Sequence, residues 1–425
     1  MKRKTWPGAS RVRRSFITLL AANALSVTGT MLSLLAVPWF VLESTGSAAL
    51  TGVAAFSTTF PIVVSAAFGG TLVDRLGFRG ASVLSDLAGG LVVLAMPVLT
   101  WTDGLSYPAL LGLLFVRWLL ATPGETARKA MVPELAALGD VRLERAVAAY
   151  DGVYRGAAMV GAPLAGVLIA WLGAGALLVV DGVTFLLSAV LIGGIPRLEG
   201  GVSERGGYLR DLRDGLAFLW RDRLQLSGTT MLVVVNMLDT GVTQVLLALY
   251  ARDVAHDPRA FGLLAGAVGA GALAGTVGYG AVGERLPRRL TYGLCFLLAG
   301  VPRVLVLALG APFPVALGVT VLSGFAAGAI NPILGMLQYD RIPAPLRARV
   351  IGTMTAAAYA GMPAGGLLAG TLTELTGLTA TLYAFAAVYL LASLPPFACR
   401  AWRELDRDDP AGVTRRRPGS AGETR

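Results

Sequence analysis

The stretch Gly70-Thr71-Leu72-Val73-Asp74-Arg75-Leu76-Gly77-Phe78-Arg79 lies between two long apolar runs, at roughly 50–69 and 82–101. Ten residues are too few to cross a bilayer, which takes about 20 residues of helix. The stretch is therefore predicted to form a tight loop that holds two membrane helices side by side. Gly70 and Gly77 fit this prediction, because a turn this short requires close backbone approach and positive φ values.

The charges of this loop recur later in the chain. Asp74 and Arg75 place opposite charges where helix ends meet lipid headgroups, and Arg79 can contact anionic lipid or the start of the next helix. A second stretch, Gly280-Ala281-Val282-Gly283-Glu284-Arg285-Leu286-Pro287-Arg288-Arg289, begins 210 positions after the first and repeats its glycine, acid, arginine and basic end. Two copies half a chain apart indicate a duplication. The second copy carries its charges on Glu284, Arg285 and Arg288.

The first copy resembles the loop signature of the major facilitator superfamily, G-x-L-x-D-R-x-G-x-R, between the second and third helices of those transporters. The sequence departs from the family at Phe78, where a basic residue is usual, and at Glu284 and Pro287, which replace an aspartate and a glycine. The resemblance covers about residues 15–400, and residues 35–47 look like the branch of siderophore exporters and macrolide efflux proteins. It implies an all-α integral membrane fold with twelve transmembrane helices in two pseudo-symmetric six-helix bundles.

The composition excludes an ordinary soluble domain. Hydrophobic residues make up 55% of the chain, the mean hydropathy is +0.67, and 15% of residues are charged, against about 25% in soluble proteins. Cys295 and Cys399 fit no disulfide framework, and a single histidine, His256, rules out a histidine-based metal cluster. The chain also lacks a P-loop and clustered catalytic side chains, so it is predicted to be no enzyme and to need no cofactor. Pumping would draw on an ion gradient, here expected to be of protons, or on a partner ATPase.

Twelve apolar segments, most near the length that spans a membrane, follow one another along the chain. Backbone groups in lipid have to form hydrogen bonds within their own segment, so these segments are predicted to be helices. The predicted spans are residues 16–42, 49–72, 82–101, 107–122, 146–172, 176–195, 227–250, 260–282, 290–309, 313–336, 350–372 and 378–399.

The net charge of +10 does not indicate a nucleic-acid partner, because of where the charges lie. Of the 36 lysines and arginines, 31 lie in the termini and the even-numbered loops, and the odd-numbered loops hold only Arg252 and Arg259. By the positive-inside rule, both termini are predicted to be cytoplasmic. The protein is thus expected to be a multi-pass protein of the cell membrane, with the lipid bilayer and a small molecule as partners, and to function as a monomer.

The chain divides into four parts. An N-terminal bundle at 1–195 and a C-terminal bundle at 227–399 flank a cytoplasmic linker at 196–226. In this linker, leucines at helical spacing between residues 208 and 220 predict an amphipathic helix on the membrane surface. Residues 400–425 form a basic tail that is predicted to be disordered.

Polar residues inside the spans are candidate functional residues, because they are costly in lipid. In the seventh span, Asn236, Asp239, Thr240 and Thr243 form a stripe at offsets of 3, 4 and 7. One interpretation is that Asp239 is locked in a structural hydrogen bond. The other is that it faces water and, with its pKa raised by partial burial, takes up and releases a proton.

Three further spans carry polar residues, namely the first, fourth and tenth. Arg117 cannot lose its proton, so it would tune a nearby acid or hold an anionic group of the substrate. Its helix resembles the family's R-x-x-x-G signature, with Ala121 in place of the glycine. The resemblance implies that the first, fourth, seventh and tenth helices line the central cavity. The remaining candidate lining residues are Asn23, Ser26 and Thr30 of the first span and Ser323 and Asn331 of the tenth.

The fifth and eleventh spans carry glycine and proline together. Gly161, Pro163 and Gly166 are similar to a degenerate form of the pattern G-x-x-x-G-P-x-x-G-G, which is associated with exporters of the family, and Gly361 with Pro363 repeats it. These residues are predicted to allow helix bending and close packing between the halves.

Other charges are expected at span ends. Asp181 and Arg303 are predicted to extend outward to the interface, and Asp86 to brace the first charged loop.

The sequence therefore predicts a secondary transporter, most simply a proton-coupled exporter of small amphipathic molecules such as antibiotics or siderophores, working by alternating access. Proton-coupled uptake of a metabolite is an alternative that the same polar stripes would serve, and a non-transporting receptor is a further one. The identity of the substrate cannot be read from these residues.

Overall fold

The computed structural model describes residues 9–102, 104–139, 141–196, 208–343 and 346–403, and it is built almost entirely of helices. Contacts group the chain into two compact units. The first unit comprises Met1–Tyr208, Asn236–Gly266 and Tyr359–Thr381, and the second comprises Leu209–Val235, Ala267–Ala358 and Leu382–Arg425. The division at 1–195 and 227–399 stays a prediction, because these units group parts of helices rather than whole halves of the chain.

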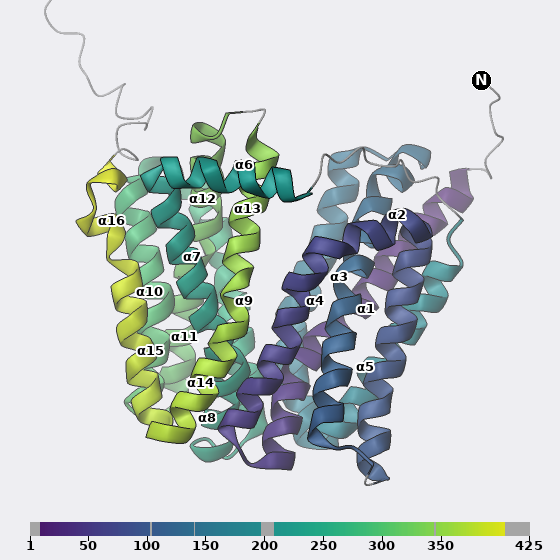
Figure 1. Cartoon of the computed structure of the whole chain (residues 1–425), viewed down its shortest axis with the longest axis horizontal. Coiled ribbons are helices and arrows are strands. Elements are labelled where there is room, and N and C mark those ends of the chain that lie inside the picture. Colours follow the sequence, from purple (N-terminus) through teal and green to yellow (C-terminus); the bar gives the residue numbers. More distant parts are fainter. Residues whose placement is uncertain (1–8, 103, 140, 197–207, 344–345, 404–425) are drawn as a thin grey trace, which may run out of the picture. The chain divides into compact units, whose positions relative to one another are not determined.

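The helices of the two units are drawn in Figure 1. The first unit holds α1 (Ala9–Thr45), α2 (Ala48–Trp101), α3 (Tyr107–Leu138), α4 (Leu143–Leu172), α5 (Ala174–Gly193), the end of α7 (Arg223–Gly241), the π-helix η1 (Val242–Leu246), α8 (Leu247–Asp253), the start of α9 (Pro258–Val282) and α14 (Met362–Thr376). The second holds nearly all of α6 (Tyr208–Arg221), the rest of α7 and α9, η2 (Gly283–Arg285), α10 (Arg288–Ala308), α11 (Phe313–Gly328), α12 (Ile330–Arg341), most of α13 (Arg347–Ala360) and α15 (Leu378–Ser393), α16 (Pro395–Ala398) and η4 (Arg400–Arg403).

Within the described residues, eleven helical stretches are long and apolar enough to cross a membrane. The span predicted at 350–372 is not among them, because it consists of two shorter helices, α13 and α14, that are separated at Gly361. The side chains on the outside of the helices are largely apolar, as lipid requires; Trp171 and Val190, for example, are both 70% exposed.

The ten-residue loop predicted at 70–79 is wrong in extent. The backbone stays helical on both sides of Gly77, whose φ of 69° and ψ of 163° make the single non-helical point inside α2. One residue with positive φ is enough to redirect the chain, so the hydrogen bonds of the flanking helical turns need not be given up.

A pair of equivalent turns shows the internal duplication in the backbone. Gly173 joins α4 to α5 with φ 80° and ψ 160°, and Gly377 joins α14 to α15 with φ 85° and ψ 163°. Each glycine is the sole residue between its two helices, and each adopts a conformation that other residues rarely take. The same one-residue connection therefore stands at matching places in the two halves of the sequence.

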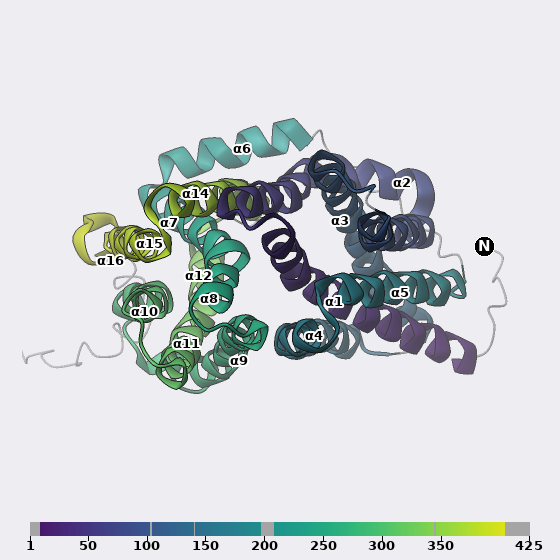
Figure 2. The same ribbon diagram turned by 90° about the horizontal axis from the view of Figure 1, so that it is seen from below.

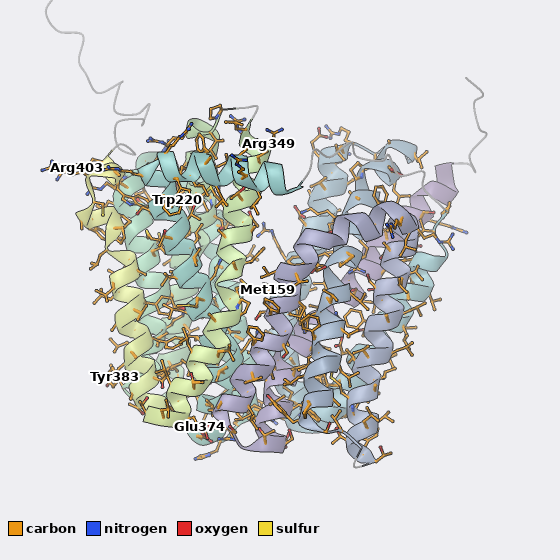
Figure 3. All side chains as sticks on the ribbon, in the orientation of Figure 1. Met159, Trp220, Arg349, Glu374, Tyr383 and Arg403 are labelled. Atoms are coloured by element: carbon orange, nitrogen blue, oxygen red, sulfur yellow. The ribbon has the colours of Figure 1, made fainter. Side chains whose placement is uncertain are left out.

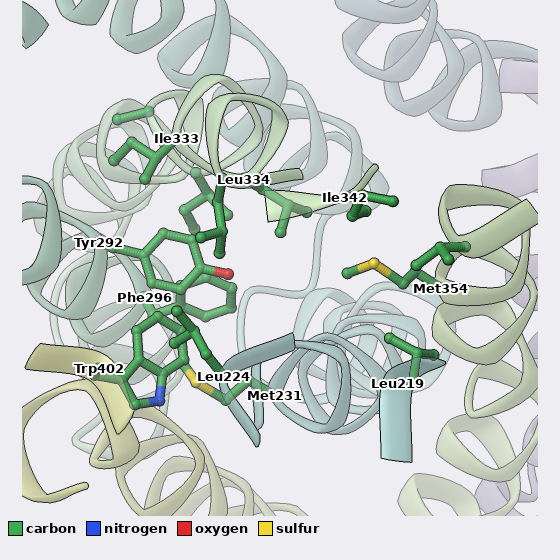
Figure 4. Close-up of a cluster of buried hydrophobic side chains, with 14 of the residues drawn as sticks. Leu219, Leu224, Met231, Tyr292, Phe296, Ile333, Leu334, Ile342, Met354 and Trp402 are labelled. Atoms are coloured by element: carbon green, nitrogen blue, oxygen red, sulfur yellow. The ribbon is translucent and has the colours of Figure 1, made fainter. Parts of the chain in front are cut away.

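Each unit has its own apolar core. In the first, α1 packs against α4 and α5, which Figure 2 shows beside it, and the core includes Leu19, Met131 and Ile192. In the second, an aromatic cluster forms around Tyr292, as Figure 4 shows: its ring lies 4.8 Å from Phe296 and 5.2 Å from Trp402, measured between ring centroids.

The helix α6 runs across the ends of α7 and α13 (Figure 1). It packs on α13 at Gly215, where a side chain would collide with Thr353, and an ion pair of 3.1 Å joins Asp214 to Arg349. Leu219, which was predicted to face the membrane surface, is buried in the core of the second unit. Part of the apolar face of α6 is thus covered by protein.

The tail departs from the prediction of disorder at its first residues. Residues 400–403 form η4, because the ring of Trp402 is fully buried and its Nε1 donates a hydrogen bond of 3.0 Å to Ser227. The rest of the predicted tail, at 404–425, lies outside the described residues.

Candidate functional site

A cavity with a volume of about 250 Å³ lies in the first unit, where helices from distant parts of the chain meet. This volume is near the lower limit of sites that take small molecules, which hold roughly 300 Å³ or more. The cavity is lined by Leu34 of α1, Thr58, Thr59 and Ile62 of α2, Trp118 of α3, Asp239 and Thr240 of α7, Thr243 and Gln244 of η1, and Met362 of α14.

The lining combines apolar side chains with a few polar ones. Asp239 is half-buried and is the carboxylate of this set. Gln244 is buried, and its Oε1 accepts a hydrogen bond of 3.1 Å from the hydroxyl of Thr58. Such a lining suits a small molecule with an aromatic or aliphatic body and one polar or positively charged group.

The π-helix η1 carries two of the lining residues. Its hydrogen bonds run from each residue to the fifth one along, a rare geometry that occurs frequently at functional sites. Here it places Thr243 and Gln244 in succession toward one cavity, directly after the turn of α7 that carries Asp239.

The structure brings together part of the predicted stripe. Asp239, Thr240 and Thr243 line the cavity, whereas Asn236 is not among the lining residues. Sequence reasoning missed Gln244, although it extends the stripe by one position, at an offset of four from Thr240. The contributions of α2, α3 and α14 carry no comparable signal, because only the fold brings these helices to the cavity.

Arg117 does not line the cavity but lies behind it, in the interior of the first five helices. Its side chain is buried, and its Cζ lies 4.1 Å from the ring centre of Phe185 and 5.3 Å from that of Trp118. The opposite charges that act on it are those of Asp181 and Asp86. Trp118 therefore separates the cavity from a buried set of charges, and Arg117 and Asp239 do not share one lining.

Two groups of buried charged and polar side chains, which we call layers, lie among the first five helices, one around Asp86 and one around Asp181. Asp86 is the centre of the first. Its carboxylate accepts hydrogen bonds of 2.9 and 3.0 Å from Arg128 and one of 2.6 Å from Ser188. Ser26 donates a further bond of 3.4 Å. The prediction that Asp86 braces the charged loop is wrong, because these partners hold it inside the bundle. Ser26 and Asn23 were both predicted to line the cavity. Ser26 is instead a hydrogen-bond partner of Asp86, and Asn23 is buried one turn before Ser26 on the same helix.

Asp181 forms the second layer, and the prediction that it extends outward is wrong. The residue is fully buried, and it accepts a hydrogen bond from the hydroxyl of Ser33. Gly29 makes room for it, because a side chain there would collide with the carboxylate. Ser26 and Ser33 lie two turns apart on one face of α1, so each layer receives one serine from that helix.

The other predicted cavity residues lie elsewhere. Thr30 donates a hydrogen bond of 2.9 Å to the carbonyl of Ser26. Ser323 is buried and Asn331 is exposed, and both belong to the second unit. Arg303, predicted to reach outward, is instead buried in that unit and donates a hydrogen bond of 2.8 Å to the hydroxyl of Tyr389.

The two charged loop copies make equivalent contacts, each inside its own unit. Arg79 donates a hydrogen bond to the carbonyl of Gly193, at the end of α5. Arg289, which is 210 positions later, donates to the carbonyls of Pro396 (2.6 Å) and Phe397 (3.1 Å) at the end of α16. In both copies an arginine thus satisfies carbonyls at a helix terminus.

The remaining residues of the loop signature divide into exposed and undescribed ones. Arg75 and Arg285 are exposed, and Arg288 is partly exposed. The side chains of Asp74 and Glu284, and the surroundings of Gly70, lie outside what the structure describes.

The glycine and proline motifs lie where backbones touch in the first unit. Gly166 of α4 meets Gly262 of α9, and Pro163 meets Gly266 one turn further along. Gly161 leaves room for Met31 of α1. No larger residue fits at these crossings without moving a helix.

The eleventh predicted span makes a similar crossing with α2. Gly366 and Gly370 of α14 approach the backbone of Gly52, and the helix is broken just before, between Gly361 and Pro363. At the end of the same helix, Glu374 accepts hydrogen bonds of 3.2 Å from the Ser47 hydroxyl and the Ala49 N–H at the start of α2.

Metal binding finds no support in the geometry. Within the residues that the structure describes, no group of three His, Cys, Asp or Glu side chains is close enough together to hold a metal ion.

Comparison with known proteins gives consistent relatives over the whole chain. Residues 229–422 match the family model described as Major Facilitator Superfamily. The chain is 32% identical to the multidrug efflux pump Tap of Mycobacterium tuberculosis over 405 residues, which cover 93% of this chain and 96% of that protein. The pump of the same name from Mycolicibacterium fortuitum is also 32% identical, over 93% of this chain and 98% of the relative.

Solved structures share the fold at low sequence identity. The nucleoside transporter NupG superimposes with a TM-score of 0.74 at 13% identity, covering 90% of this chain and 98% of that one. A bacterial homologue of the human lysosomal transporter Spinster, in an inward-facing and unoccupied conformation, gives a TM-score of 0.66 at 15% identity, covering 95% and 99%.

Proposed function

The chain belongs to the Major Facilitator Superfamily, and on that premise we propose that it exports small amphipathic molecules in exchange for protons, by alternating access. The observation that carries this proposal is the 32% identity to multidrug efflux pumps over 93% of the chain. Two structural features support the proposal. Many helices are long and apolar enough to cross a membrane, and the cavity is lined by both polar and apolar side chains.

The cavity supports a substrate with an apolar body and one polar or cationic group. Leu34, Ile62, Met362 and Trp118 offer apolar and aromatic surface, and Asp239 offers the negative charge. A carboxylate in such a lining can bind either a proton or a cationic substrate but not both at once. This competition would couple proton entry to substrate release.

In this proposal Asp239 is the proton carrier. Arg117 is the fixed positive charge, and it acts on the buried carboxylates behind Trp118 rather than across the cavity. The loop arginines Arg75 and Arg285, with the acids beside them, would latch the outward-facing state on the cytoplasmic side.

Everted membrane vesicles that contain the full chain test this function. An imposed proton gradient should drive accumulation of a cationic dye such as ethidium, and a protonophore should abolish it. Asp239→Asn should lower driven accumulation of this cation at least tenfold, because the carboxylate shared by proton and cation is gone. Exchange of an uncharged substrate should be spared, because the rest of the cavity remains. Asp253→Asn, on α8 and exposed, is the matched control and should transport normally.

Other results would point to other functions. Gradient-driven accumulation in right-side-out vesicles instead of everted ones would indicate uptake, and the absence of flux with a broad panel of compounds would indicate a receptor. Normal driven transport by the Asp239→Asn protein would remove Asp239 from the proton-carrying role.

A further inference from the structure

A second, larger cavity lies in the second unit, apart from the candidate transport site. Its volume is about 1680 Å³, and it is formed where α6 meets α7, where α12 ends and where η4 begins. Its lining is Phe218, Arg221, Asp222, Arg223, Leu224, Ser227, Arg341, Pro343, Cys399, Arg400, Ala401 and Arg403.

This cavity is strongly basic, with five arginines against one aspartate. The aspartate is already engaged: Asp222 accepts the N–H groups of Leu224 and Gln225 at the start of α7, and it pairs with Arg341 at 3.3 Å. The other four arginines, Arg221, Arg223, Arg400 and Arg403, are exposed and form no ion pair with any described residue. Like charges that converge on one cavity repel one another, and an anion bound between them would offset this repulsion by its attraction to each.

The positions of two of these arginines are fixed by the tryptophan between them. Trp402 is fully buried, stacks on Tyr292 (Figure 4) and bonds to Ser227 of α7. Arg400 and Arg403 flank it in η4, so they are held at the rim of the cavity; Figure 3 shows Arg403 at the same end of the unit as Trp220 and Arg349. The fold therefore holds the backbone that carries this part of the basic lining.

An apolar groove continues from the basic cavity. It has a volume of about 330 Å³ and shares Arg223 and Ser227 with the basic cavity. From there it follows α7 from Leu226 to Val234, a distance of about 12 Å at 1.5 Å per residue. Its other walls are Thr230, Met231, Ala392 and Pro395.

We propose that these two spaces together bind one anionic phospholipid, with its phosphate among the arginines and an acyl chain in the groove along α7. Arginine suits this task, because its planar guanidinium pairs with two phosphate oxygens at once. A soluble phosphate would fill the basic cavity alone and would leave the groove without an occupant. The bound lipid ties α6, α7 and η4 together and so stabilises the second unit.

The test uses the full chain, purified in detergent, with native mass spectrometry and thermal unfolding as readouts. Phosphatidylglycerol should bind and raise the unfolding temperature, whereas phosphatidylcholine and glycerol 3-phosphate should do neither. Neutralising two arginines, in Arg223→Gln/Arg403→Gln, should weaken phosphatidylglycerol binding roughly tenfold to thirtyfold, since each surface arginine contributes about 1 kcal/mol to binding of anionic lipid. The matched control is Arg142→Gln/Arg145→Gln, two exposed arginines of the first unit.

A second variant probes the groove separately. Ala392→Trp fills it without changing the charge, and it should weaken phosphatidylglycerol binding while the protein still elutes as a single folded species. Equal binding of phosphatidylcholine, equal protection by glycerol 3-phosphate, or unchanged lipid binding in either variant would overturn the proposal. These experiments measure lipid binding and unfolding rather than transport. Their outcome is therefore independent of whether the proposed transport function is correct.

Discussion

Buried charges in the first five helices are held by partners that only the tertiary structure supplies. Asp86 receives Arg128, Ser188 and Ser26, each from a different helix, so its charge is compensated on several sides. Asp181 receives Ser33, with Arg117 as the neighbouring positive charge. In a bundle that lipid surrounds, such groups have no access to bulk water, so removing one partner leaves the other buried and uncompensated.

The pair of Asp86 and Arg128 gives a prediction at this scale. Asp86→Asn or Arg128→Met alone should destabilise the protein by about 3–5 kcal/mol, because each leaves one buried charge without its partner. The double variant Asp86→Asn/Arg128→Met should recover at least half of that loss. Thermal unfolding of the purified variants in detergent measures this, and equal, additive losses would show that the two residues do not act as a pair.

Single residues also show which features of the site could be predicted from the sequence and which could not. Helical spacing predicted that Asp239, Thr240 and Thr243 share one face, and the three line one cavity; their role in transport stays a prediction. The same reasoning placed Asp181 at the membrane interface, since distance from a helix end says nothing of which neighbours surround a side chain. Its burial depends on Gly29 and Ser33 of α1, residues that lie about 150 positions away.

At the scale of helices, glycines decide which faces can touch. Gly262 of α9 meets the backbone of α4 at Ala162 and Gly166, at distances that no side chain would tolerate. Gly269, on the same helix, has open space around it. The motif of glycine and proline could be found in the sequence, but its partner helix could not, because spacing on one helix does not identify the surface that it meets.

This contrast yields a matched pair of substitutions. Gly262→Ala should force α4 and α9 apart and lower both the unfolding temperature and the transport rate, the latter at least severalfold, because a new Cβ would lie 2.6 Å from the carbonyl oxygen of Ala162. Gly269→Ala should leave both unchanged or slightly raise stability, since alanine is the better helix former. Dye efflux and thermal unfolding of the two proteins, compared side by side, check the expectation. Similar behaviour of the two variants would refute the packing role of Gly262.

At the scale of the whole chain, the duplication is visible in equivalent contacts. Arg79 and Arg289 each satisfy the end of the last helix of their half, and Gly173 and Gly377 make equivalent turns. The repeat could be predicted from the two charged stretches. The sequence did not show which arginine of the second copy plays the part of Arg79, because Arg288 and Arg289 stand next to each other there.

The two arginine contacts are expected to contribute to stability independently of each other. Arg79→Ala should lower stability by about 1–1.5 kcal/mol, at or below the lower end of the range for charged hydrogen bonds because the site is partly exposed, and Arg289→Ala by somewhat more because it makes two such bonds. The combined variant should show the sum to within about 0.5 kcal/mol, because the two sites share no partner. Arg75→Ala and Arg285→Ala, from the same two stretches but exposed, serve as controls and should have little effect on thermal unfolding. A marked departure from the sum would argue against two separate sites.

The π-helix η1 has a consequence for how the lining of the cavity could change. A π-helix bonds over five residues where an α-helix bonds over four, so η1 holds one residue more than a regular helix would over the same bonds. Losing one residue from Val242–Leu246 would let α7 run straight into α8, and α8 would keep its facing, because the wider turn of a π-helix already absorbs the extra residue. A single-codon deletion would therefore change which side chains this short segment, now Thr243 and Gln244, presents to the cavity, and it would leave the helix beyond in place.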